Sequence, residues 1–321
     1  MIIPKMAHIT GNPKPFSPLG LGCWQYDSNR WSAEQDQILL DTMDAALAHG
    51  MAHFDTATGY GSGASEKVVG RFLQGGRERV FVATKADIQD ENPQTMLKSV
   101  KASLERLNTD YIDLYYIHWP RSDMDIRPAV EGLERARAQG LVRSVGVSNF
   151  SVAQMELVSQ VGKIDAQQIP YSLIWRAPER QVIPYCQSHG IGVIPYGAMG
   201  YGILTGKFTR KPFFKPEDDR SHRILFFEEP TWGAIYAAVE QMKAVAQEVE
   251  RPLQHLALRW SLAQPGIVCA LAGANSPAQV MQNASALEGE LPAWVLDRLT
   301  AISDALKKDI PAEANPYRFE P

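Results

Sequence analysis

The sequence predicts a (β/α)8 barrel, the TIM-barrel fold, and three observations support this fold class. Short apolar runs alternate with amphipathic stretches along the chain, as in parallel strands joined by helices. Eight such runs are present, which is the number of strands in this barrel. Gly50, Gly140 and Gly190 each stand just before one of these runs, where a helix should end. The alternative is a doubly wound open sheet, which usually has fewer strands and a glycine-rich first turn.

The predicted strands are four to six residues long and apolar almost throughout, as expected for strands that are buried on both faces. They lie at 18–22, 52–55, 80–84, 112–117, 143–147, 165–169, 191–195 and 268–271. The segments between them carry apolar residues at helical spacing. In the segment 96–107 these residues recur at steps of four, four and three, at Met96, Val100, Leu104 and Leu107.

Three segments go beyond a minimal barrel. Residues 199–232, after the seventh strand, form a connection too long for an ordinary turn, and connections of this length usually cover or bind something. Two helices, at 235–249 and 252–263, precede the eighth strand. An extra helix near 292–306 leads into a polar tail at 309–321. No segment resembles a linker, so we expect residues 1–321 to form a single domain.

Composition narrows the class of protein. Hydrophobic residues make up 45% of the chain and charged residues 21%, which is typical of a globular protein. The formal charge of -4 gives no reason to expect nucleic acid or an anionic membrane as a partner. No apolar stretch approaches the roughly 20 residues of a spanning helix, and the first residues lack a secretory signal. We therefore expect a cytoplasmic enzyme with a small-molecule substrate, and the oligomeric state stays open.

Four polar residues stand at or near the ends of predicted strands, at Asp55, Tyr60, Lys85 and His118. The carboxyl ends of barrel strands form the face that carries chemistry. An ordinary tyrosine phenol has a pKa near 10 and exchanges protons poorly at neutral pH, whereas a neighbouring ammonium favours its phenolate form. An aspartate can hold that ammonium in place, and a neutral histidine can orient a substrate oxygen. The four side chains therefore predict proton transfer to or from an oxygen.

Seven motifs in this order resemble those of the aldo-keto reductases, and together they span nearly the whole chain. They are GLGCW at 20–24, FDTATGYG at 54–61, TK at 84–85, IHWP at 117–120, GVSNF at 146–150, GYGILTGKF at 200–208 and LAGANSPAQVMQN at 271–283. The resemblance implies a barrel that binds NADP(H) without a Rossmann fold and reduces aldehydes or ketones to alcohols. It also implies that Tyr60 is the general acid/base, that Lys85 and Asp55 activate it, and that His118 orients the substrate.

The resemblance further implies a set of cofactor-binding residues. For the nicotinamide end they are Ser148, Asn149, Gln168 and Tyr196, the last stacking on the ring, and Trp24 is a further cofactor-binding residue. For the pyrophosphate they are Gly197, Ala198, Met199, Gly200, Gly202, Leu204 and Lys207. For the adenosine end they are Gly273, Asn275, Gln279, Gln282 and Asn283, with Arg220 reaching a 2′-phosphate. Asn275 and Gln282 stand where the family often has a basic and an acidic residue, so NADP(H) is the first expectation for the cofactor and NAD(H) the alternative.

The substrate site is expected around Tyr60 and His118, with Trp24, Tyr26 and Trp119 as walls. No metal site is predicted, because Gly50 breaks the helix that would have to present His49 and His53 together. The leading function is an NADP-dependent reductase of aldehydes and ketones. Two alternatives stay open: a dehydrogenase that oxidises sugars or polyols, and a redox-sensing regulatory subunit that binds NADP.

Overall fold

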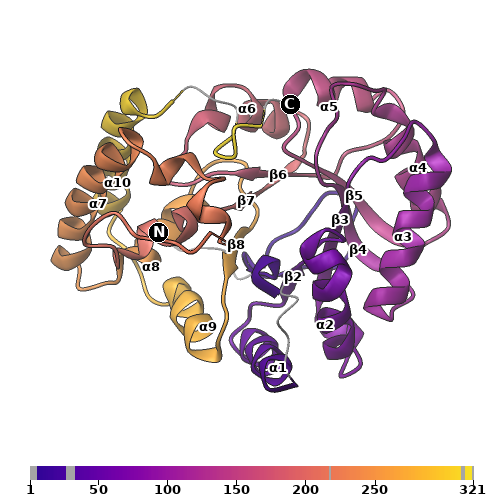
Figure 1. The fold of residues 1–321 in the computed structure, drawn as a ribbon, viewed down its shortest axis with the longest axis horizontal. Coiled ribbons are helices and arrows are strands. Elements are labelled where there is room, and N and C mark those ends of the chain that lie inside the picture. Colours follow the sequence, from indigo (N-terminus) through magenta and orange to yellow (C-terminus); the bar gives the residue numbers. More distant parts are fainter. Residues whose placement is uncertain (1–5, 27–32, 217, 312–314, 320–321) are drawn as a thin grey trace.

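The computed structural model of the chain describes residues 6–26, 33–216, 218–311 and 315–319. Eight strands form the centre and helices surround them (Figure 1). The strands are β1 Leu19–Gly22, β2 His53–Asp55, β3 Phe81–Ala86, β4 Ile112–Ile117, β5 Val142–Ser148, β6 Ala166–Pro170, β7 Gly192–Tyr196 and β8 Ala270–Gly273. Each overlaps a strand predicted from the sequence, so the expected strand order is confirmed.

The sheet is parallel throughout, in the order β7-β6-β5-β4-β3-β2-β1-β8. It closes between β7 and the residues just before β8. There, Val193 pairs with Ile267, the Val193 amide donates to the Gly266 carbonyl (3.1 Å) and the Val268 amide donates to the Val193 carbonyl (3.0 Å). The predicted (β/α)8 barrel is therefore confirmed, and the open-sheet alternative is wrong.

Helices follow the strands and pack against their outer surface (Figure 1). They are α1 Ala33–Ala48, α2 Ala64–Leu73, α3 Pro93–Leu107, α4 Arg127–Ala138, α5 Val152–Val158, α6 Val182–Ser188, α7 Thr231–Glu248, α8 Leu253–Leu262, α9 Pro277–Ala284 and α10 Ala293–Leu306. The apolar face predicted for 96–107 is the buried face of α3. Gly50, Gly140 and Gly190 adopt φ values of 77°, 73° and 66°, the left-handed conformation that ends a helix. The two helices before β8 and the extra helix α10 are also as predicted.

Alternation along the strands decides what fills the barrel. In β3, Phe81 and Ala83 belong to an inner cluster of buried side chains, whereas Val82 packs outward against the helices. Leu114 and Tyr116 of β4 point inward in the same way. At Gly146 of β5, a Cβ atom would stand 2.4 Å from the Tyr116 ring, so only glycine leaves room for that ring. The interior of the barrel is therefore filled by packed side chains.

Across the described residues, no helix has both the length and the apolar character needed to cross a bilayer.

Candidate active site

The alternation that fills the barrel also brings polar side chains to its mouth. Lys85 continues the inward series of Phe81 and Ala83, and His118 follows β4 in register with Leu114 and Tyr116. Asp55, Ser148 and Tyr196 are the last residues of β2, β5 and β7, and Gln168 is the middle residue of β6. Asp55, His118, Ser148, Gln168 and Tyr196 line one cavity of about 1950 Å³, and Lys85 lies buried beneath it. The sequence-predicted site is therefore a single place in the structure.

Lys85 is the centre of a buried hydrogen-bonded group. Its Nζ atom donates to Asp55 Oδ1 (2.5 Å), to the Thr56 carbonyl (2.9 Å) and to Tyr60 Oη (3.3 Å). The Lys85 side chain is fully buried and that of Asp55 is 3% exposed. Asp55 Oδ2 accepts a further hydrogen bond from Gln168 Nε2 (2.9 Å). An ammonium group thus contacts the phenol oxygen of Tyr60, and a carboxylate holds that ammonium.

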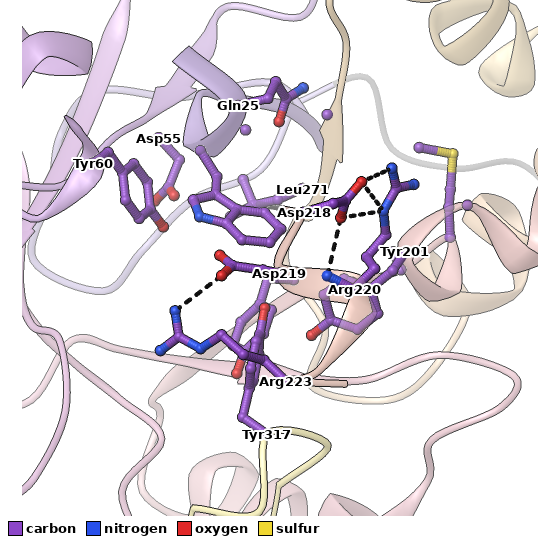
Figure 2. Close-up of a pocket in the computed structure, with 18 of the residues that line it drawn as sticks. Gln25, Asp55, Tyr60, Tyr201, Asp218, Asp219, Arg220, Arg223, Leu271 and Tyr317 are labelled. Atoms are coloured by element: carbon purple, nitrogen blue, oxygen red, sulfur yellow. Dashed lines mark hydrogen bonds and ion pairs between the residues drawn. The ribbon is translucent and has the colours of Figure 1, made fainter. Parts of the chain in front are cut away.

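Tyr60 reaches the site from a tight turn rather than from a strand. It begins the short 3-10 segment Tyr60–Gly63, in which Gly61, Ser62 and Gly63 have φ values of 56°, 52° and 89°. Two glycines supply most of this left-handed backbone at low steric cost. Figure 2 shows the Tyr60 ring beside Asp55 at one side of the cavity, with the phenol oxygen directed inward.

His118 stands next to Tyr60, with the two rings edge to face and 5.8 Å between their centroids. Burial lowers the pKa of His118 below its ordinary value, and Asp87 offsets part of that effect. Asp87 Oδ1 lies 3.4 Å from His118 Nδ1, and this contact in turn lowers the pKa of the Asp87 carboxyl. His118 is therefore neutral at pH 7. The sequence reasoning missed Asp87, although its place two residues after Lys85 could have indicated it.

The residues expected to hold the nicotinamide form one connected group. Asn149 has a left-handed backbone (φ 64°), and its Nδ2 atom donates to Ser148 Oγ (3.0 Å) and to the His118 carbonyl (3.3 Å). Tyr196 Oη donates to Asn149 Oδ1 (2.8 Å). Ser148, Asn149, Gln168 and Tyr196 all line the cavity.

The loop after β7 divides into lining and supporting residues. Gly197, Ala198, Met199, Gly202 and Lys207 line the cavity, as expected for pyrophosphate ligands. Two residues expected beside them do not line it. Leu204 is fully buried in the core, and Gly200 packs so closely against Ile174 that a Cβ atom would stand 2.6 Å from that side chain. Their positions are better explained by packing beneath the loop than by contact with a ligand.

Arg220 lines the cavity on the side opposite Tyr60 (Figure 2). Its guanidinium group is held by Asp218 through three hydrogen bonds of 2.6 to 3.2 Å and lies over the Phe214 ring. Arg223 Nη1 makes one contact with Asp219 Oδ1, at 3.3 Å. Burial and the nearby Arg220 lower the pKa of Lys207. The loop thus brings cations to the cavity, two of them already paired with carboxylates of the same loop.

The residues that the sequence resemblance assigns to the adenosine end lie in one neutral region of the cavity wall. It consists of Gly273, Asn275, Gln279, Gln282 and Asn283. The Asn275 backbone N–H donates to Gln279 Oε1 (2.7 Å), and Asn283 Nδ2 donates to the Gly273 carbonyl (3.3 Å). No charged side chain belongs to this set of five residues.

The walls of the substrate end differ from the prediction at one position. Trp24 and Trp119 line the cavity as expected. Tyr26 does not: it is fully buried and its hydroxyl donates to the Ala274 carbonyl (3.2 Å). The expectation for Tyr26 is wrong because the residues Trp24–Tyr26 form a single 3-10 turn, which points the two rings in different directions. Instead, Tyr317 and Phe319 of the C-terminal segment pack against Trp119, with ring centroids 6.1 and 4.7 Å away.

Within the described part of the chain, no group of three or more His, Cys, Asp or Glu side chains could hold a metal ion.

Known proteins share both the sequence pattern and this fold. The model of the aldo/keto reductase family matches residues 18–304. An NADH-specific methylglyoxal reductase of Escherichia coli is 32% identical over 316 residues, covering 91% of this chain and 96% of that protein. The structure of the glycerol dehydrogenase AKR11B4 from Gluconobacter oxydans superposes with a TM-score of 0.86 at 32% identity and 96% coverage of each chain.

An aldo/keto reductase from Klebsiella pneumoniae, solved with NADP and acetate, superposes with a TM-score of 0.76 at 27% identity, covering 94% of this chain and 96% of that one. With the family match spanning most of the chain, and with the barrel and its polar mouth, this protein is a member of the aldo/keto reductase family of oxidoreductases.

Proposed function

We propose that this protein reduces aldehydes or ketones to alcohols with NADP(H), or with NAD(H) as the alternative, and that Tyr60 is its general acid/base. The observation that carries the proposal is the contact of Lys85 Nζ with both Asp55 and Tyr60 at the mouth of the barrel. His118, neutral at pH 7, stands beside the phenol and supplies a second group for the substrate oxygen. The names of two relatives, a methylglyoxal reductase and a glycerol dehydrogenase, describe related chemistry.

The cavity residues fit a nicotinamide dinucleotide. The cavity volume of about 1950 Å³ exceeds the roughly 300–1000 Å³ of a drug-sized ligand site, which leaves room for a cofactor and a substrate together. Gly202 has φ 98°, and a Cβ atom there would stand 3.6 Å from Lys207 and 3.9 Å from Arg220. The absence of a side chain keeps open the space in front of these two cations, where a pyrophosphate would bind. Amide and hydroxyl groups of Ser148 and Gln168 suit the carboxamide of a nicotinamide.

The protein's own groups supply the proton and the electrostatic stabilisation. When bound, the nicotinamide cofactor supplies the hydride to the carbonyl carbon. Tyr60 Oη gives its proton to the carbonyl oxygen, and the Lys85 ammonium stabilises the phenolate that remains. Asp55 keeps Lys85 in place. His118 orients the substrate oxygen, and solvent returns a proton to Tyr60. Alcohol oxidation uses the same groups in reverse order.

The test is Tyr60→Phe, which removes the proton donor and little else. General acid–base catalysis contributes about 10²–10⁴-fold, so we expect turnover of an activated benzaldehyde with NADPH or NADH to fall about 10³-fold. Dinucleotide affinity, measured by fluorescence titration, should change less than about twofold. Tyr185→Phe, which alters a tyrosine of α6 outside the cavity, is the matched control and should retain full activity.

Two results would contradict the proposal. Full activity of Tyr60→Phe would show that Tyr60 is not the general acid/base. Tight dinucleotide binding by the wild type without turnover of any carbonyl or polyol would favour the redox-sensing subunit over an enzyme. Assaying glycerol oxidation with NADP+ and NAD+ beside reduction of the activated benzaldehyde decides the preferred direction of the reaction.

A further inference from the structure

A residue far from the site in sequence completes the group around Asn149 and Tyr196. Asn315, in the C-terminal segment 315–319, is 2% exposed. Its Nδ2 atom donates to Asn149 Oδ1 (2.9 Å) and to Tyr196 Oη (3.1 Å). Its Oδ1 atom accepts from the Tyr317 backbone amide (2.9 Å). The C-terminal segment therefore reaches directly into the group that the nicotinamide would contact.

The hydrogen bonds define the orientation of each amide. Asn315 Oδ1 faces a backbone N–H, which can only donate, so its Nδ2 must face Asn149 and Tyr196. Asn149 Nδ2 faces the His118 carbonyl, which can only accept, so Asn149 Oδ1 must face the two donors. Burial raises the pKa of Tyr196, so its hydroxyl keeps the proton that it donates to Asn149. Every donor in the triangle of Asn149, Tyr196 and Asn315 meets an acceptor.

The segment has other attachments that do not involve Asn315. The Leu225 amide donates to the Pro316 carbonyl (3.1 Å). Tyr317 packs edge to face against Tyr201, with 5.8 Å between ring centroids, and Figure 2 shows these two rings together at the cavity. Arg318 pairs with Glu228. These contacts dock the segment, so the role of Asn315 can be separated from docking by substitution.

We propose that Asn315 is a positioning residue that holds Asn149 and Tyr196 in the arrangement that receives the nicotinamide ring, so that the C-terminal segment is part of the cofactor site. This inference rests on the proposed function, because it assumes that a nicotinamide lies against these residues. It assigns Asn149 an indirect role. The side-chain amide of Asn149 already makes four hydrogen bonds. Ser148 Oγ accepts one of them, and its hydroxyl hydrogen can be donated to a ligand.

The experiment compares two ligands by titration, without any turnover. NADH and NADPH contain the nicotinamide, and ADP-ribose lacks it. Asn315→Ala removes both donated hydrogen bonds, so we expect about tenfold weaker dinucleotide affinity and unchanged ADP-ribose affinity. Asn315→Asp places a carboxylate against Asn149 Oδ1, where a donor is needed, and should weaken dinucleotide binding further than alanine does. Asn92→Ala, which removes the side-chain cap of α3 at a residue outside the cavity, is the matched control and should bind both ligands as the wild type does.

Three outcomes overturn the inference: wild-type dinucleotide affinity in Asn315→Ala, a parallel loss of ADP-ribose affinity, or tighter dinucleotide binding. The last would mean that the segment competes with the cofactor. If circular dichroism shows that Asn315→Ala is unfolded, Tyr196→Phe decides instead. It removes one of the two acceptors and should cost about threefold in dinucleotide affinity alone. Wild-type protein that binds ADP-ribose but neither dinucleotide would refute the proposed function, and the inference with it.

Discussion

The buried pair of Lys85 and Asp55 allows stability and activity to be separated in one experiment. Lys85→Met keeps most of the side-chain volume but removes the ammonium, so Asp55 keeps only the Gln168 amide among the donors to its carboxylate described above. Both side chains are almost fully inaccessible, at 0% and 3% exposure. Removing one partner of a buried ion pair costs roughly 3–5 kcal/mol, because the other charge is left uncompensated. We expect the free energy of unfolding to fall by about 4 kcal/mol, a large share of a typical 5–15 kcal/mol.

The double variant Asp55→Asn, Lys85→Met removes both charges. It should recover about half or more of the lost stability, because no unpaired charge remains in the core. Its activity should stay about 10³-fold or more below wild type, since Tyr60 still lacks the ammonium. The assay is urea unfolding followed by circular dichroism at pH 7, with turnover measured on the same samples.

Lys243→Met provides the matched control. Lys243 makes an exposed pair with Glu240 in α7, and such pairs contribute about 0–1 kcal/mol. The reasoning is refuted if Lys85→Met lowers the free energy of unfolding by less than about 1 kcal/mol, or if the double variant is less stable than Lys85→Met alone.

Three further predictions concern pH and cofactor choice. Burial lowers the pKa of His53 to about 4, so the unfolded chain, with a pKa near 6.5, takes up the proton first. The free energy of unfolding should therefore fall by up to about 3 kcal/mol as the pH drops from 6.5 to 4. In His53→Gln, the urea concentration at the unfolding midpoint should depend less on pH than in the wild type. An equal dependence in the two proteins would contradict this. Asn275→Arg should raise the NADPH-to-NADH ratio of kcat/KM about tenfold, and an unchanged ratio would argue against the adenosine end assigned here. Asp218→Asn should free Arg220 and tighten NADPH binding severalfold at low salt, an effect that rising ionic strength should remove.

Much of the fold could be predicted because the barrel repeats one pattern. An apolar run buried on both faces and a following amphipathic helix are local features, and eight repeats of them leave few alternatives. Lys85 and His118 were predictable for a related reason. Once the side chains that point into the barrel are known along a strand, the last of them must point into the mouth of the barrel. The order of the family motifs then indicated which oxygen chemistry the mouth carries.

The errors occur where the direction of a side chain depends on irregular backbone, and the omissions occur where a residue acts through a contact with another element. Tyr26 lies only two residues after Trp24, yet a single 3-10 turn sends its ring into the core. Leu204 belongs to a glycine-rich loop whose whole sequence resembles a ligand site, but the Leu204 side chain is buried in the core beneath the loop. Asp87 and Asn315 belong to no motif, because their importance lies in a contact with a residue on another element.

The sequence by itself determined the strand order, the helices between the strands and the four side chains at the barrel mouth, since each depends on a local period or a short motif. Only the tertiary structure decided which residues support those four and the neighbouring group of Asn149 and Tyr196. Asp87 comes against His118, and Asn315 lies 166 residues from Asn149 along the chain yet donates a hydrogen bond to it. The physical reason is that a hydrogen bond between distant segments requires two separately folded backbones to bring a donor and an acceptor within about 3 Å, and no local pattern encodes that distance.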